Sequence, residues 1–169
     1  MLPDDTPVVT DRGGDADEIQ VVYRDADYGW PGTRDPEEYV EFGYTLPLVH
    51  DRETPGFSGC CWYEGDGHTE LADRLLVASL DAEALYVVSV MPAGELPPDV
   101  SGDLHRGRAT DPNLDAVVEP VLDGALGRLR NVVETPDGGL LVLTANAGYA
   151  GEGRAFVPPE GGDSVVRLQ

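Results

Sequence analysis

The sequence predicts an all-β fold of short antiparallel strands, and three observations lead to this prediction. Glycine and proline contribute 21 and 14 of the 169 residues, which favours strands joined by turns over long helices. Helical periodicity is weak throughout, whereas short apolar runs recur along the chain. Two such runs flank Pro136-Asp137-Gly138-Gly139, a turn sequence typical of a β-hairpin.

Taken in order, the apolar runs define the expected strands. They cover residues 19–23, 57–63, 75–80, 85–90, 117–122, 129–134, 140–144 and 165–168. Residues 36–40 and 69–74 are the best candidates for a helical turn or two. Residues 91–116 and 145–163 are too polar and too rich in glycine and proline for a core, so we expect loops there.

The grouping of these strands favours a β-propeller. Residues 57–122 supply four successive strands, the number in one blade. Residues 128–168 supply three strands of a second blade, and residues 19–23 would be the remnant of an earlier one. We therefore predict a partial propeller of about two to three four-stranded antiparallel blades over residues 14–169, after a disordered or truncated N-terminus over residues 1–13. A β-sandwich of similar strand count is the alternative that this pattern leaves open.

The chain is strongly acidic. Eleven basic residues, all of them arginine, stand against 32 acidic residues, for a formal net charge of −21. The acidic residues are spread along the whole length, which indicates adaptation to a salty cytoplasm or medium, because salt screens their mutual repulsion. An acidic surface for a basic partner is the alternative. Nucleic acid and anionic membranes are poor partners for such a surface.

Neither a membrane span nor a secretory signal is predicted. No apolar run approaches 18 residues, and the first residues have neither a basic start nor an apolar stretch. We expect a soluble protein, cytoplasmic as it stands and exported if an upstream signal is missing. Cys60 and Cys61 are adjacent, so we interpret them as small buried hydrophobic residues and not as a disulfide framework.

Arg128 and Arg130 form the clearest candidate site. Their i, i+2 spacing places both side chains on one face of a predicted strand. Two neighbouring guanidinium groups repel each other unless an anion or carboxylates lie between them, and planar guanidinium groups suit carboxylates well. The alternative is a set of salt bridges to the many Asp and Glu side chains.

Several segments resemble the soluble quinoprotein glucose and sorbosone dehydrogenase family. Arg128-Leu129-Arg130-Asn131-Val132, followed by Thr135-Pro136-Asp137-Gly138-Gly139 and Leu140 to Thr144, resembles the closing blade of that family. Further matches follow in the same order along the chain. They are Asp17-Glu18-Ile19, Asp27-Tyr28-Gly29-Trp30-Pro31, Ser58-Gly59 with Trp62-Tyr63, Asp73 to Leu80, and Asp163 to Leu168. The resemblance covers residues 14–169.

The resemblance implies a six-bladed propeller that binds pyrroloquinoline quinone (PQQ) and calcium at one mouth of its channel. Such proteins oxidise the C1 hydroxyl of aldoses by hydride transfer to the quinone, assisted by a histidine base. Arg128 and Arg130 match the arginine pair that contacts the cofactor. Trp30, with Tyr28 near it, matches an aromatic at the substrate side. The alternative for Tyr28 and Trp30 is a tight turn that packs both rings on the core.

The chain also departs from the family pattern. The catalytic histidine lies in earlier blades, and His50, His68 and His105 fall in polar, loop-like stretches that do not match it. Asp81 stands where a lysine binds the cofactor, and we expect an acid there to repel a carboxylated quinone. Asn131 replaces an aspartate. No catalytic residue and no metal ligand are assigned, and we interpret the acidic cluster at residues 15–18 as a solvated loop.

The predicted function is therefore the C-terminal portion of a PQQ-dependent aldose dehydrogenase-like propeller, which oxidises sugar C1 hydroxyls when complete. Its expected partners are the missing N-terminal blades or a second copy of the chain. The alternatives are a non-catalytic propeller remnant that acts as a binding or self-assembly module, and a product without function.

Overall fold

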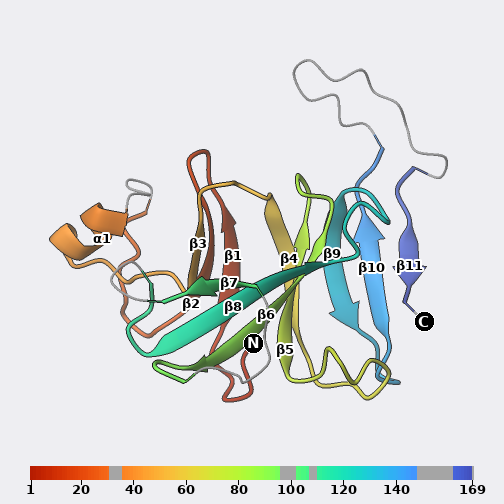
Figure 1. Ribbon diagram of the computed structural model, residues 1–169, viewed down its shortest axis with the longest axis horizontal. Helices are drawn as coiled ribbons and strands as arrows, with labels where there is room; N and C mark the ends of the chain where they lie inside the picture. The colour runs from red at the N-terminus through yellow and green to blue at the C-terminus, as the bar shows by residue number, and fades with distance from the viewer. Residues whose placement is uncertain (31–35, 96–101, 107–109, 148–161, 169) are drawn as a thin grey trace.

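The computed structural model describes residues 1–30, 36–95, 102–106, 110–147 and 162–168, which form three antiparallel sheets (Figure 1). The N-terminal sheet has the order β1-β2-β3, the middle sheet β4-β5-β6-β8-β7 and the C-terminal sheet β11-β10-β9. The strands are β1 (Val8–Arg12), β2 (Asp17–Val21), β3 (Val49–Asp51), β4 (Phe57–Tyr63), β5 (Arg74–Ser79), β6 (Leu85–Pro92), β7 (Asp103–His105), β8 (Leu114–Val121), β9 (Leu129–Glu134), β10 (Leu140–Thr144) and β11 (Val165–Arg167). Helix α1 (Pro36–Phe42) lies between β2 and β3 in sequence.

The middle sheet buries both of its faces, each against a different neighbour. On one face Leu75 and Val77 pack in a core with Ile19 of the N-terminal sheet. On the other face Leu76 packs in a second core with Leu140 of the C-terminal sheet. Successive side chains of a strand point to opposite faces, so a strand between two cores must be apolar at every position. This explains the continuous apolar run in β5.

The first strands of the three sheets, β1, β4 and β9, are neighbours (Figure 1). The hydroxyl of Thr10 in β1 donates to the carbonyl of Ser58 in β4, and the Ser58 hydroxyl lies 3.0 Å from the carbonyl oxygen of Leu129 in β9. A Cβ atom on Gly59 would lie 1.9 Å from Oδ1 of Asn131, so only glycine lets β9 approach β4 this closely. The ends of these three strands therefore meet on one side of the molecule.

The predicted strands are confirmed, with shifts of a few residues at their ends. The hairpin around residues 136–139 and the helical turn at residues 36–40 are confirmed as well. Residues 69–74 instead form hydrogen-bonded turns, in which the Leu71 amide donates to the His68 carbonyl, and β5 begins at Arg74. Pro31 and most of the loop expected at residues 145–163 lie outside the described residues.

Three strands escaped prediction. β1 lies within residues 1–13, where disorder or truncation was expected, and it is ordered because it pairs along its whole length with β2. β7 lies within the loop expected at residues 91–116, into which β6 and β8 also extend. β3 was not expected at all. These short strands gain their backbone hydrogen bonds from a neighbouring strand, which no local apolar run reveals. No helix in the described ranges is long and apolar enough to cross a membrane.

Candidate functional site

Two arginines converge on one carboxylate where the ends of β1, β4 and β9 meet. Nη1 of Arg128 lies 2.9 Å from Oδ1 of Asp81, and Nη2 of Arg12 donates to Oδ2 of the same side chain. We call Arg12, Asp81 and Arg128 the arginine–aspartate cluster. Asp81 was expected to repel a carboxylated cofactor, but in the structure its charge is neutralised by two guanidinium groups, one of which comes from β1.

The backbone around the cluster is held independently of the three side chains. The amide of Arg128 donates to Oδ1 of Asn146 at 2.8 Å, and Nδ2 of Asn146 donates to the Leu126 carbonyl. The amide of Asp81 donates to the Pro55 carbonyl at 2.9 Å. A Cβ on Gly56, which has φ +78°, would lie 2.6 Å from Oδ2 of Asp81, so glycine makes room for this carboxylate.

Arg130 does not join the cluster. Its side chain is exposed, and among the described residues no ion pair forms with it. The sequence predicted Arg128 and Arg130 as the pair of guanidinium groups that share an anion. The structure instead brings Arg128 together with Arg12, whereas the cofactor contacts of Arg128 and Arg130 stay predictions. Salt bridging to an acidic side chain, the alternative interpretation, is found for Arg128.

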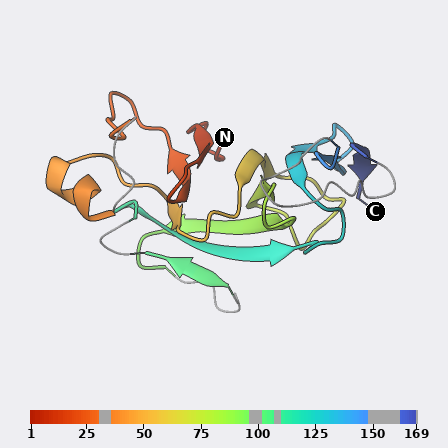
Figure 2. The ribbon, with the colours of Figure 1, turned by 90° about the horizontal axis from the view of Figure 1, so that it is seen from above.

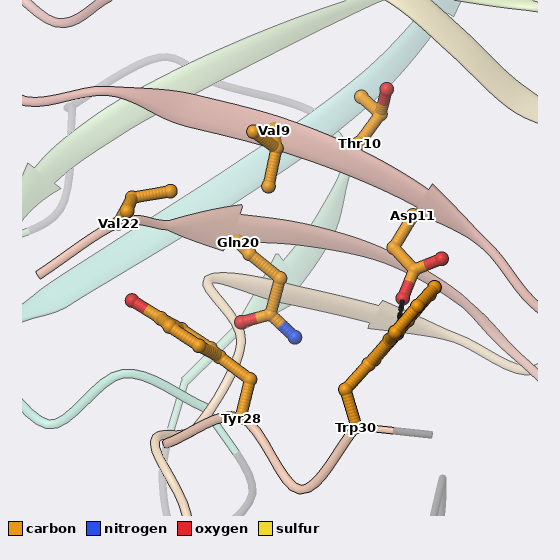
Figure 3. Close-up of a pocket in the computed structure, with 7 residues that line it drawn as sticks. All are labelled: Val9, Thr10, Asp11, Gln20, Val22, Tyr28 and Trp30. Atoms are coloured by element: carbon orange, nitrogen blue, oxygen red, sulfur yellow. Dashed lines mark hydrogen bonds between the residues drawn. The ribbon is translucent and has the colours of Figure 1, made fainter. Parts of the chain in front are cut away.

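Tyr28 and Trp30 line a pocket of about 400 Å³ on the outer face of β1 and β2 (Figure 3). The Tyr28 hydroxyl donates to the Val21 carbonyl and accepts from the Tyr23 amide, both at 2.8 Å. Nε1 of Trp30 donates to Oδ2 of Asp11 at 2.8 Å, and 70% of the Trp30 surface is exposed. The alternative interpretation required the Trp30 ring to pack on the core, and the structure shows that it does not.

Gln20 is the polar group at the base of this pocket. Its side chain lies between Tyr28 and Trp30 in Figure 3, although only 5% of the residue is exposed. Nε2 of Gln20 donates to Oε2 of Glu18 at 2.9 Å, whereas Oε1 of Gln20 is buried without a hydrogen-bond partner in the described part of the chain.

The pocket and the arginine–aspartate cluster lie on opposite faces of β1. Asp11 contacts Trp30 and Arg12 contacts Asp81, and these two residues are consecutive in a strand. The structure thus does not gather the four predicted site residues into one cavity. Sequence reasoning missed Arg12 and Gln20, because Arg12 belongs to the stretch expected to be disordered and no motif singled out Gln20.

The acidic residues of β2 are buried and structural, which corrects their interpretation as a solvated loop. Oδ2 of Asp17 accepts from the amide of Phe57 at 3.0 Å and from that of Gly56. Burial raises the pKa of Asp17, and these backbone N–H groups act in the opposite direction. Oε1 and Oε2 of Glu18 both lie 3.0 Å from the hydroxyl of Tyr39 in α1. The two carboxyls thus fasten β2 to β4 and to α1.

The histidines also differ from expectation. His50 lies in β3 and His105 in β7, so neither is in a loop. Nε2 of His50 lies 3.8 Å from Oε1 of Glu18. Burial lowers the pKa of His105. Across the described ranges, no group of three or more His, Cys, Asp and Glu side chains is arranged to hold a metal ion.

Comparison with known proteins places this chain in a family. The model of the glucose/sorbosone dehydrogenase family matches residues 9–151. The chain is 28% identical over 146 residues to the aldose sugar dehydrogenase YliI of Escherichia coli (strain K12), a match that covers 79% of this chain and 33% of that protein.

Two solved structures of similar fold also match the chain. A candidate oxidoreductase (glucose dehydrogenase) from Thermus thermophilus superposes with a TM-score of 0.61 at 27% identity, covering 96% of this chain and 40% of that one. The PQQ-bound aldose sugar dehydrogenase from Streptomyces coelicolor also gives a TM-score of 0.61, with 98% of this chain and 40% of that one covered. At 19% identity, the Streptomyces structure supports the fold alone.

The three sheets are blades of a partial β-propeller, which confirms the predicted fold class. The chain belongs to the glucose/sorbosone dehydrogenase family, as its motifs indicated. It spans 33% of the length of the curated relative and 40% of each of the two solved chains. A complete enzyme is therefore not shown.

Proposed function

We propose that this chain forms the C-terminal blades of a PQQ-dependent aldose dehydrogenase-like propeller, which oxidises the C1 hydroxyl of sugars when complete. One observation carries the proposal: a carboxylate, that of Asp81, lies between the guanidinium groups of Arg12 and Arg128. The site therefore fits the chemistry of a carboxylated quinone. When bound, such a cofactor accepts the hydride from the sugar. Arg128 and Arg130 would hold its carboxylates.

Tyr28 and Trp30 are the proposed substrate-side residues, and their pocket opens on the face of β1 opposite Arg128, so the structure does not itself bring a sugar in this pocket to the cofactor. An aldose ring has an apolar face, which suits the exposed Trp30 ring. This chain contributes binding and orientation. The histidine base would come from other blades, and we propose neither a catalytic residue nor a calcium ligand among the described residues.

The proposal is tested in a protein that also contains the upstream blades. Replacing both arginines (Arg128→Gln with Arg130→Gln) should weaken PQQ binding at least about tenfold, because each substitution removes charge-assisted hydrogen bonds. Quenching of tryptophan fluorescence measures the affinity. Arg167→Gln, which breaks an exposed pair with Asp137, is the control for lost charge. Unchanged PQQ affinity in the double variant would contradict the assignment.

A binding or self-assembly module is the second candidate. The outer face of the C-terminal sheet carries Val133, Leu141, Leu143 and Val165, and 40% of Val133 and 64% of Val165 are exposed. Apolar side chains gathered on one open sheet face mark an interaction surface, here for the missing blades or a second copy. Sedimentation of the 18.1 kDa chain distinguishes these partners, because a second copy doubles the mass.

The acidic composition bears on the salt concentration at which the protein works. We propose that it is an adaptation to high salt, since 32 acidic residues repel one another in dilute buffer. The compartment, cytoplasmic or exported, stays part of this proposal. A free energy of unfolding that does not rise between about 0.1 and about 1 M salt, where the screening length falls to about 3 Å, would argue against it.

A further inference from the structure

We propose that Arg12 and Arg128 form a binding site for small polycarboxylate anions, in which Asp81 is a displaceable internal occupant. The proposed function supplies the biological ligand, a carboxylated cofactor, but the site itself is argued from the contacts of three side chains. In this arrangement Arg12 is a cofactor-positioning residue that lies outside the motifs quoted above.

The two guanidinium groups share one carboxylate through separate oxygens. Arg128 contacts Oδ1 of Asp81 and Arg12 contacts Oδ2, so each oxygen satisfies a different cation. This is the arrangement in which two guanidinium groups would hold the carboxylate of a ligand. Asp81 therefore shows that the spacing between Arg12 and Arg128 suits a carboxylate.

Solvent reaches the cluster unevenly. The Arg128 side chain is 14% exposed, whereas Asp81 and Arg12 are 31% and 45% exposed. Arg128 is thus fixed at the base, and the carboxylate lies where a soluble anion can compete for it. An ion pair with this much exposure is weak, because water screens it. A soluble anion can therefore displace the Asp81 carboxylate from the two guanidinium groups at a small cost in free energy.

Asp81 can leave the cluster without loss of its turn. The amides of Asp81 and Ala82 both donate to the Pro55 carbonyl at 2.9 Å, and the Ser79 amide donates to the Ala84 carbonyl at 3.0 Å. Arg128 is held through its own amide by Asn146. The positions of the arginines and of the turn therefore do not depend on the Asp81 carboxylate.

The local charge determines which ligand binds. Arg12 and Arg128 with Asp81 sum to one positive charge, within a chain of formal charge −21 that otherwise repels anions. Neutralising Asp81 raises the local charge to two and leaves both guanidinium groups open to a ligand. One carboxylate of a ligand can then make both contacts, and further carboxylates on the same molecule add an attraction to the two positive charges that a monocarboxylate or chloride lacks.

Citrate is the probe, titrated by calorimetry into the 169-residue chain at constant ionic strength. Asp81→Asn should bind citrate at least about tenfold more tightly than the unmodified chain, since both guanidinium groups are released. Adding Arg12→Gln to Asp81→Asn should return the affinity to the unmodified level. Asp137→Asn, which removes one carboxylate from the exposed pair with Arg167, should leave citrate binding unchanged.

Equal citrate affinity of Asp81→Asn and the unmodified chain would overturn the proposal, and so would tight binding that survives Arg12→Gln. If Asp81→Asn does not fold, Asp81→Ser replaces it. If neither variant folds while Asp137→Asn does, Asp81 is structural and not displaceable, which also overturns the proposal.

A parallel titration with PQQ, in the protein that contains the upstream blades, separates this inference from the proposed function. Citrate binding by Asp81→Asn without PQQ binding by any form would reject the dehydrogenase assignment and keep the anion site. PQQ binding that is insensitive to Arg12→Gln, with no citrate binding by Asp81→Asn, would reject the anion site alone.

Discussion

Each of the two outer sheets packs one face on the middle sheet, and the two sheets differ in how much of the opposite, outer face the chain covers. The N-terminal sheet covers part of its outer face with its own chain: Tyr39 of α1 contacts Glu18, and Trp30 contacts Asp11, while Val9 stays 46% exposed. The outer face of the C-terminal sheet instead leaves Val133 and Val165 exposed. Figures 1 and 2 show α1 and the C-terminal sheet at opposite ends of the molecule.

This difference shows two ways in which the outer face of a sheet can be built when only the inner face packs on another sheet. The N-terminal sheet buries polar side chains, Glu18 and Gln20, and supplies partners for most of their atoms. The C-terminal sheet keeps an apolar face that suits another sheet. The outer face of the N-terminal sheet is thus partly covered by the chain itself, and the outer face of the C-terminal sheet is the better candidate for contact with further blades or a second copy.

The largest expected effect is in the middle sheet. Leu76→Ala should lower the free energy of unfolding by about 2–5 kcal/mol, because Leu76 is fully buried between two sheets. Leu141→Ala, on the outer face of the C-terminal sheet, should cost about 1 kcal/mol or less. Urea unfolding at fixed salt measures both. Similar losses for the two variants would mean that the outer face is already covered.

A smaller effect is expected where α1 closes the N-terminal sheet. Tyr39→Phe removes the hydroxyl that contacts both oxygens of buried Glu18, and it should cost about 1–3 kcal/mol. Tyr44→Phe is the matched control from the same region, since the Tyr44 ring packs against Tyr39 but its hydroxyl makes no hydrogen bond among the described residues. An equal loss in both variants would show that ring packing, and not the Glu18 contact, closes this face.

The last expected effect concerns pH and arises only in alkaline solution. Burial raises the pKa of Cys61 from 9.0 to about 12, and Cys61 packs against the core shared with the C-terminal sheet. The unfolded chain loses this proton near pH 9 while the folded chain keeps it, so the contribution of Cys61 to stability declines as pH rises from about 9 to 12.

The difference in unfolding midpoint between the unmodified chain and Cys61→Ala, followed through this range, measures that contribution. Cys60→Ala, on the opposite face of β4, reports the core shared with the N-terminal sheet in the same way. A difference for Cys61→Ala that does not change with pH would show that the C-terminal sheet opens enough to hydrate the thiol.

Much of the fold could be predicted because burial on two faces leaves a local trace. Strand β5 at the centre of the fold contains a continuous apolar run, and the Asp-Gly turn identifies the β9–β10 hairpin. The short strands β1, β3 and β7 left no such trace, since their order comes from pairing with a neighbour. The motif that contains Tyr28 and Trp30 was identified, but its position on the outer face of β1 was not.

By itself, the sequence determined the strand pattern and the acidic character of the chain. These follow from composition and from the two-residue period of a strand. Only the tertiary structure decided that Arg128 shares Asp81 with Arg12, because Arg12 and Asp81 are 69 residues apart in the chain. Strand periodicity fixes the face to which a side chain points, but its partner there depends on how distant strands pack.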